Sequence, residues 1–247
     1  MTRKRTSPVV PLAVAGIAAV ALVGVLVGTG GSGDSEPDAG ARAEVTDTSP
    51  QVAPEDDPLA QLPRREKGDP MALGDVDAPV VMVSYSEFQC PFCGKFARDT
   101  EPELVEQYVE DGTLRIEWRD FPYLGQESAT AALAGRAAAA QGRFWEFHDA
   151  MYADQPSPNS GAIDQAYLDA IAEEIGLDVA DFRRDMASPQ AQQAMAADFT
   201  EGQQIGVTGT PAFIINGQPV IGAQPTATFE QVIEDAADAA ADDTASR

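Results

Sequence analysis

Cys90 and Cys93 are the two cysteines of the chain, and they lie in the stretch EFQCPFCGKF, residues 87–96. Their spacing has three explanations: a redox pair that closes and opens a disulfide, part of a metal site, or a chance pair of inert thiols. A zinc site within one chain needs two more ligands, because zinc prefers four nitrogen or sulfur ligands. The chain has no third cysteine, and its one histidine, His148, lies in the apolar-periodic stretch FWEFHDAMY, which predicts a packing or capping role. We therefore expect no metal site, with a zinc ion shared by two chains as the remaining alternative.

A strand and a helix are predicted to position the two thiols. VVMVSYS, Val80–Ser86, is a short β-branched run that predicts a buried strand, and a helix follows from about Pro91 to Asp111. Pro91 suits the first turn of a helix, whereas Pro102 should kink or break the helix because proline lacks an N–H group. Cys90 is therefore expected where a strand ends and a helix begins.

A thiolate at the start of a helix is stabilised by unpaired backbone N–H groups and by the helix macrodipole, so the pKa of Cys90 should fall. Cys93 follows one turn later on the same face, within reach of a disulfide. Such a disulfide closes too small a loop to add much chain-entropy stabilisation, so the pair suits exchange better than a structural role. Phe92, between the cysteines, cannot stabilise a thiolate as a histidine would, but its ring could contact a substrate.

The remaining elements predict one α/β domain. TLRIEWRD, Thr113–Asp120, alternates as a second strand does, and the stretch from Gln126 to Ile205 shows helical spacing throughout. AFIIN, an Asn-Gly turn at residues 216–217 and QPVIG predict a β-hairpin. TATFEQVIEDAADAAAD predicts an acidic terminal helix. A sheet of these strands must bury both faces against helices, which gives a layered α/β fold.

The charge balance is strongly acidic, with 40 Asp and Glu against 16 Lys and Arg and a formal net charge of −24. Binding of nucleic acid needs clustered basic residues, so we expect no nucleic-acid partner. The same balance argues against binding of the folded part to an anionic membrane surface. An acidic surface of this kind keeps a protein soluble.

The N-terminus has the pattern of a membrane anchor. Arg3, Lys4 and Arg5 precede an uncharged apolar run, Val9–Val27, which would span about 28 Å as a helix. The positive-inside rule predicts that residues 1–8 remain in the cytoplasm and that the chain after the apolar run is exported. A cleaved signal peptide is the alternative, although the run ends in a poor cleavage site. We therefore predict a single-pass signal-anchor in the cell membrane, with an extracytoplasmic C-terminal domain.

Residues 28–67 are rich in Gly, Ser, Pro, Asp and Glu and show no apolar period. This composition predicts a disordered tether. A coil of about 40 residues has a root-mean-square reach of about 35 Å, enough to hold a domain near the membrane and let it turn. The folded domain is then expected over residues 68–247.

Four stretches, in this order, resemble the DsbA-like branch of the thioredoxin superfamily, which comprises exported thiol-disulfide oxidoreductases. They are VVMVSYSEFQCPFCGKFA, RDFPYLG, AAQGRFWEFHDAMY and GVTGTPAFIINGQPVIGA. The resemblance covers roughly residues 69–240. It implies a thioredoxin fold with an inserted helical subdomain, here about residues 126–205.

The resemblance also implies roles for single residues. Cys90 would be the exposed nucleophile and Cys93 the resolving thiol. The peptide bond before Pro211 would be cis and lie beside the disulfide, and the chain at Thr210 would pair with an extended substrate. Glu87 would assist proton movement to Cys93. The alternatives are an ordinary proline at a strand start for Pro211 and a plain surface carboxylate for Glu87.

The expected activity is protein disulfide oxidation. The redox-active disulfide Cys90–Cys93 would pass to unfolded or reduced exported proteins, without any other cofactor, and export favours this direction because disulfides persist outside the cytoplasm. The resemblance implies a membrane partner that reoxidises the pair. An isomerase or reductase of the same fold and a chaperone-like peptide-binding module are the alternatives.

Overall fold

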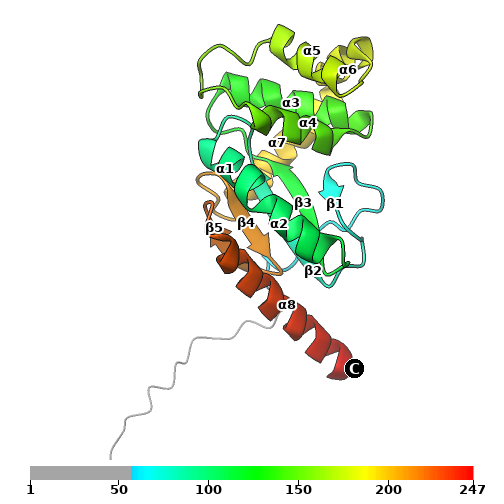
Figure 1. Ribbon diagram of the computed structural model, residues 1–247, viewed down its shortest axis with the longest axis vertical. Helices are drawn as coiled ribbons and strands as arrows, with labels where there is room; N and C mark the ends of the chain where they lie inside the picture. Colours follow the sequence, from blue (N-terminus) through cyan, green and yellow to red (C-terminus); the bar gives the residue numbers. More distant parts are fainter. Residues whose placement is uncertain (1–56, 247) are drawn as a thin grey trace, which may run out of the picture. The chain divides into compact units, whose positions relative to one another are not determined.

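The computed structural model describes residues 57–246 (Figure 1). The predicted cytoplasmic segment 1–8, the predicted anchor 9–27 and residues 28–56 of the predicted tether lie outside this range. Across 57–246, none of the helices combines the length and the apolar character that a bilayer span requires.

A five-stranded sheet forms the centre of the domain, with the strand order β1-β3-β2-β4-β5. Strands β2 and β3 are parallel, and the other three pairings are antiparallel. All residues of β2, β3 and β4 are buried, because helices cover both faces of the sheet. The strands are β1 (Ala72–Leu73), β2 (Val80–Ser86), β3 (Leu114–Asp120), β4 (Ala212–Ile215) and β5 (Gln218–Ile221).

The connection from β2 to β3 is helical but broken. It consists of α1 (Pro91–Asp99), α2 (Glu101–Leu104) and a π-helical turn, Val105–Val109. The break lies at Thr100, two residues before Pro102, which occupies the first turn of α2. The predicted interruption at Pro102 is therefore confirmed, and its cause is the clash of the proline ring with the preceding turn.

Five helices lie between β3 and β4 and form the inserted helical subdomain. Figure 1 shows α5 and α6 stacked outside α3 and α4, while α7 runs back toward the sheet. Side-chain oxygens of Asp164, Asp178 and Ser188 cap α5, α6 and α7 by accepting a backbone N–H. The helices are α3 (Gln126–Ala140), α4 (Phe144–Ala153), α5 (Gln165–Glu174), α6 (Val179–Met186) and α7 (Pro189–Gln204).

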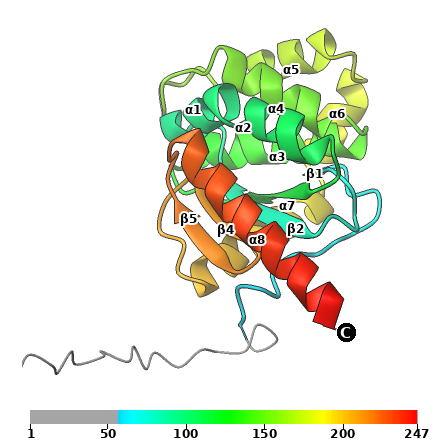
Figure 2. The same cartoon turned by 60° about the horizontal axis from the view of Figure 1, so that its bottom comes forward.

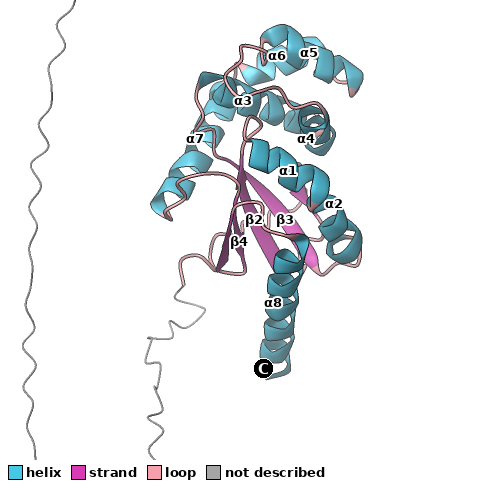
Figure 3. Cartoon of the chain, turned by 60° about the vertical axis from the view of Figure 1, so that its left-hand side comes forward, coloured by secondary structure: helices cyan, strands magenta, loops and turns pink. Residues whose placement is uncertain are grey.

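The two faces of the sheet pack against different helices, because side chains alternate along each strand. Val80 and Met82 face one core with α1 and α8 (Thr226–Ser246), whereas Val81 and Val83 face another with α7. Figure 3 shows α7 on one side of the sheet and α1, α2 and α8 on the other. The expected fold class, a thioredoxin fold with a helical insertion, is confirmed.

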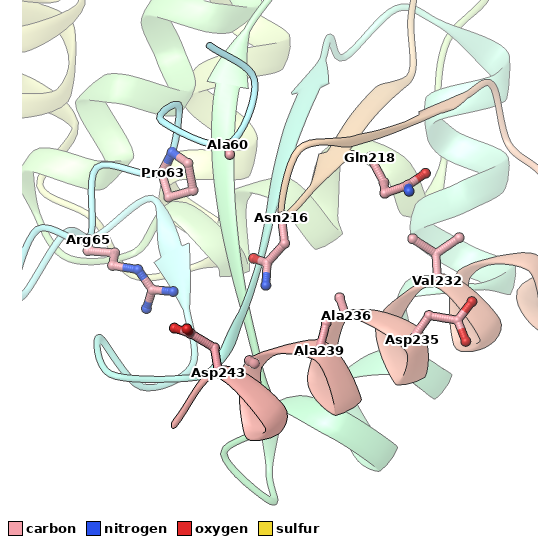
Figure 4. Close-up of a pocket in the computed structure, with 11 residues that line it drawn as sticks. Ala60, Pro63, Arg65, Asn216, Gln218, Val232, Asp235, Ala236, Ala239 and Asp243 are labelled. Atoms are coloured by element: carbon pink, nitrogen blue, oxygen red, sulfur yellow. The ribbon is translucent and has the colours of Figure 1, made fainter. Parts of the chain in front are cut away.

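The predicted hairpin and the terminal helix are also present. Asn216 and Gly217 both have positive φ, 44° and 92°, as a tight turn between β4 and β5 requires. Helix α8 crosses the sheet and continues past it (Figure 2). A pocket of about 730 Å³ opens between this end of α8, the hairpin turn and residues 60–65 (Figure 4). Neither cysteine lines the pocket.

Residues 57–67, which we call the strap, differ from the prediction. The sequence places them in a disordered tether, but Leu59 and Leu62 pack on the sheet core that also contacts α7. The backbone N–H groups of Arg64 and Arg65 donate to the carboxylate of Glu117 at 2.9 and 2.8 Å. The ordered domain thus begins before residue 68, because the buried Glu117 carboxylate on β3 requires hydrogen-bond donors and the strap provides two of them.

Glu117 is the centre of this attachment. Its side chain is fully buried, and it accepts further hydrogen bonds from Arg115 Nε and Arg119 Nη2, each at 2.9 Å. Burial alone would raise the pKa of Glu117, but the strap N–H groups and the two guanidinium groups outweigh it and lower the pKa to about 2. Four donors therefore hold one ionised carboxylate inside the fold.

Candidate active site

The two cysteines lie at the junction that the sequence predicts. Cys90 occupies the N-cap position of α1, and Cys93 lies in the first turn of this helix. Both are free thiols, and the Cys90 Sγ donates a hydrogen bond to the carbonyl oxygen of Thr210 at 3.2 Å. The strand-to-helix junction thus brings the pair against the loop before β4.

Cys90 is more covered than expected. The resemblance implies an exposed nucleophile, but only 2% of Cys90 is exposed in this dithiol form. The Thr210 loop covers the thiol, while Phe92 beside it is 63% exposed. The exposure that the resemblance implies is therefore not found in this form, because the Thr210 loop packs on the start of α1.

The electrostatics of the two thiols differ. The pKa of Cys90 is lowered to about 6, chiefly by a hydrogen bond from the Cys93 thiol. Burial acts in the opposite direction and raises the pKa. Hydrogen bonds from the Thr210 side chain and from the backbone N–H groups of Cys93 and Phe92 lower it further. The pKa of Cys93 is raised well above its usual value, first by burial and then by the neighbouring Cys90. The pair therefore combines one stabilised thiolate with one thiol that holds its proton.

The peptide bond between Thr210 and Pro211 is cis, the isomer that the resemblance implies. The Thr210 carbonyl accepts from Cys90, and the Pro211 carbonyl accepts the N–H of Gly222 at 2.8 Å. Strand β4 begins at the next residue. This loop therefore lies between the redox pair and the edge hairpin β4–β5.

Glu87 is a buried carboxylate, so the alternative of a plain surface residue is excluded. Only 2% of the residue is exposed, and neither carboxylate oxygen has a partner in hydrogen-bonding geometry. Burial raises the pKa of Glu87 to about 7, and the charge of Cys90 adds to the rise, while the nearby Ser128 hydroxyl and Leu124 N–H oppose it in part. Glu87 can therefore take up or release a proton close to neutral pH.

Replacing Glu87 with glutamine is expected to stabilise the dithiol form at pH 8 but not at pH 4.5. The pKa of Glu87 is about 7 in the folded wild type and about 4.5 in the unfolded chain. Its protonated form therefore stabilises the fold below about pH 4.5, and this contribution is lost as the pH rises from about 4.5 to 7. A shift of this size corresponds to about 3 kcal/mol. Urea unfolding at both pH values measures it, with the exposed Glu106→Gln as control. Equal effects of Glu87→Gln at the two pH values would contradict the assignment.

Three large hydrophobic side chains are exposed among residues 57–246: Phe92, Tyr123 and Ile221. The charge of Cys90 contributes to a raised pKa of Tyr123, after burial, which places the phenol near the thiol. Ile221 pairs with Ala212, directly after Pro211. Of the three, Phe92 is predicted from the sequence because it lies between the cysteines, whereas Tyr123 lies in a loop and the exposure of Ile221 depends on its place at the sheet edge.

His148 occupies a packing position, as predicted. Its ring lies in edge contact with Trp118, Trp145 and Tyr152, and its Nε2 is 3.4 Å from Glu101 Oε2. Within residues 57–246, His, Cys, Asp and Glu side chains form no group of three that would bind a metal ion.

The comparisons with known proteins agree with this geometry. A profile of the thioredoxin family matches residues 66–235. The chain is 30% identical over 165 residues to a probable disulfide bond formation protein D of Bacillus cereus, covering 62% of this chain and 76% of that protein.

Two solved structures share the fold. Oxidised BdbD of Bacillus subtilis superposes with a TM-score of 0.64 at 21% identity, over 69% of this chain and 94% of that one. Wolbachia pipientis alpha-DsbA1 gives a TM-score of 0.64 at 24% identity, over 70% and 94%. The family profile, the relative and the shared architecture lead to one conclusion: the chain belongs to the thioredoxin superfamily and is a DsbA-like thiol-disulfide oxidoreductase.

Proposed function

We propose that this oxidoreductase introduces disulfides into exported proteins through Cys90 and Cys93, and that residues 9–27 hold it at the outer face of the cell membrane. The asymmetry of the two thiols carries the proposal. A Cys90 thiolate that is stable near pH 6 makes the reduced state favourable, and a protein disulfide whose reduced state is favourable is a strong oxidant. The disulfide is the redox group, and the proposal needs no other cofactor.

The exchange proceeds in two balanced steps. A substrate thiolate attacks the Cys90 sulfur of the protein disulfide, the Cys90–Cys93 bond breaks, and the Cys93 sulfur takes a proton. A second substrate thiolate then attacks the substrate sulfur of the mixed disulfide and expels the Cys90 thiolate. Two electrons pass from the substrate dithiol to the protein, and the low pKa of Cys90 makes it a good leaving group in the second step.

Glu87 is proposed to supply the proton that Cys93 takes up. Its carboxyl is buried near the redox pair, and its pKa of about 7 leaves it partly protonated at neutral pH. The departing Cys93 sulfur needs a proton because its own pKa is high. The same burial keeps the carboxyl protonated until a stronger base, the departing Cys93 thiolate, takes the proton.

An unfolded chain is the substrate that the surface around Cys90 fits. Phe92, Tyr123 and Ile221 offer apolar contact area, and folded proteins seldom present matching apolar segments. The loop at Thr210–Pro211 lies beside the thiol, where an extended peptide could add to it by strand pairing. We propose that these residues receive reduced exported chains and that a membrane protein reoxidises the pair afterward.

Oxidative refolding separates this proposal from its alternatives. The oxidised protein is mixed with a reduced protein that requires two disulfides, and the substrate's thiols are counted over time. A disulfide donor removes substrate thiols stoichiometrically without added oxidant. A reductase leaves them unchanged, and an isomerase rearranges a wrongly paired substrate faster than it oxidises a reduced one.

A further inference from the structure

The loop that carries the first cysteine is attached to the helical insertion. Residues 87–90, which we call the redox loop, connect β2 to α1. Gln155, just after α4, donates its side-chain Nε2 to the carbonyl oxygens of Phe88 and Cys90 at 2.8 and 3.0 Å. Tyr152, near the end of α4, donates its hydroxyl to the carbonyl of Glu87 at 2.8 Å. Three carbonyls of the redox loop thus accept donors from one end of α4.

The side chain of Gln89, within the redox loop, also forms hydrogen bonds to the helical insertion. Its Nε2 donates to Ser128 Oγ at 2.7 Å, and its Oε1 accepts the N–H of Asn159 at 2.7 Å. Ser128 lies on α3, and Asn159 lies in the connection between α4 and α5. The insertion therefore holds both the backbone and the side chain of the redox loop.

The approach of Gln155 depends on a glycine in α1. A Cβ atom at Gly94 would lie 2.4 Å from Gln155 Oε1, closer than real Cβ contacts occur. The N–H of Gly94 donates to the Cys90 carbonyl at 3.1 Å, so this carbonyl receives one bond from α1 and one from Gln155. The absence of a side chain at position 94 leaves the space in which Gln155 reaches the redox loop.

These contacts bear on the chemistry of Cys90 through its own peptide group. A carbonyl oxygen carries partial negative charge, which disfavours a thiolate on the same residue unless a donor offsets it. The Gln155 amide supplies such a donor in addition to the N–H of Gly94. It also fixes the orientation of the Phe88–Gln89 and Cys90–Pro91 peptide groups. The second of these sets how the first N–H groups of α1 face the Cys90 sulfur.

We propose that Gln155 is a positioning residue for thiol-disulfide exchange, which holds the Cys90 peptide group so that the helix start faces the reacting sulfur. The proposal rests on the proposed function, because it concerns the thiolate that function uses. It assigns the helical insertion a role in setting the reactivity of Cys90.

The test is the pH titration of the Cys90 thiolate in the reduced full-length protein, read by ultraviolet absorbance and by the rate of alkylation. Gln155→Ala is expected to raise the pKa of Cys90 by about one unit, a tenfold loss of thiolate at acidic pH. Gln155→Glu keeps the size of the side chain but lacks the amide donor, so it should raise the pKa at least as much. If both variants raise the pKa of Cys90 in this way, misfolding of a single variant does not explain the shift.

Gln141→Ala is the matched control. Gln141 also bonds to backbone groups within the insertion: it donates to the Asp178 carbonyl at 3.1 Å and accepts the Asp178 N–H at 2.9 Å, and neither bond involves the redox loop. It should leave the Cys90 titration unchanged. The role of Gln155 is contradicted if both Gln155 variants shift the Cys90 titration no more than Gln141→Ala does. The proposed function still stands in that case, provided that the pKa of Cys90 in the wild type is low. A wild-type pKa near 9 contradicts both.

Discussion

Replacing Cys90 with serine is expected to reduce disulfide exchange by the full-length protein to the uncatalysed rate. Cys90 carries the stabilised thiolate, and a serine hydroxyl neither forms a disulfide nor leaves as a stable anion at neutral pH. The assay is oxidation of a reduced substrate protein, followed by its free thiols. Far-ultraviolet circular dichroism should show an unchanged fold, because the substitution exchanges one small side chain for another.

The matched variant is Cys93→Ser, which keeps the Cys90 sulfur but removes the thiol that resolves the mixed disulfide. Incubated with a substrate protein that already carries disulfides, it should accumulate covalent complexes, because the Cys90 thiolate opens a substrate disulfide and no Cys93 thiol follows to release it. These complexes should be visible on a non-reducing gel and absent from Cys90→Ser. A chaperone-like binding module would suppress substrate aggregation equally well in both variants and in the wild type. That result, together with oxidation at the wild-type rate in Cys90→Ser, would reject the exchange mechanism.

Replacing Glu117 with alanine is expected to lower the free energy of unfolding by about 3–5 kcal/mol, the usual cost of breaking a buried ion pair by removing one partner. The substitution leaves the buried guanidinium groups of Arg115 and Arg119 without this carboxylate and removes the acceptor for the strap N–H groups. Urea unfolding near pH 7 measures the loss. Glu117→Gln keeps the size and one acceptor oxygen, so it should lose less.

The pH dependence gives this prediction a specific signature. The pKa of Glu117 is about 2 in the folded protein and lies near 4.5 when unperturbed, so its contribution is present above about 4.5 and is lost as the pH falls toward 2. The alanine variant should lack this slope. It should also free the strap, so that trypsin cleaves after Arg64 and Arg65 faster than in the wild type. A variant as stable and as resistant to trypsin as the wild type would contradict the attachment of the strap.

Local patterns predicted most of the scaffold. The placement of Cys90 between β2 and α1 follows from a β-branched run and a proline at a helix start, and the break before Pro102 follows from a missing N–H. The hairpin follows from Asn216 and Gly217. Each of these depends on a few adjacent residues, which a sequence displays directly.

The features that were missed depend on residues far apart in the chain. The strap has the composition of a linker, and its order depends on Glu117, more than 50 residues away. Gln155 is 65 residues from Cys90, and nothing in its local sequence marks it as a contact of the redox loop. Burial of Cys90 depends on Thr210, 120 residues away. Such contacts depend on tertiary packing, which cannot be predicted from the periodicity or composition of a local segment.

The reduction potential of the Cys90–Cys93 pair tests the central claim most directly. The protein is equilibrated with glutathione buffers of known ratio, and the fraction of reduced protein is measured after acid quenching. A stabilised Cys90 thiolate predicts a potential of about −120 to −180 mV, the range of proteins that donate disulfides. A value near about −270 mV, as in thioredoxin, would identify a reductant and contradict the proposed direction of exchange.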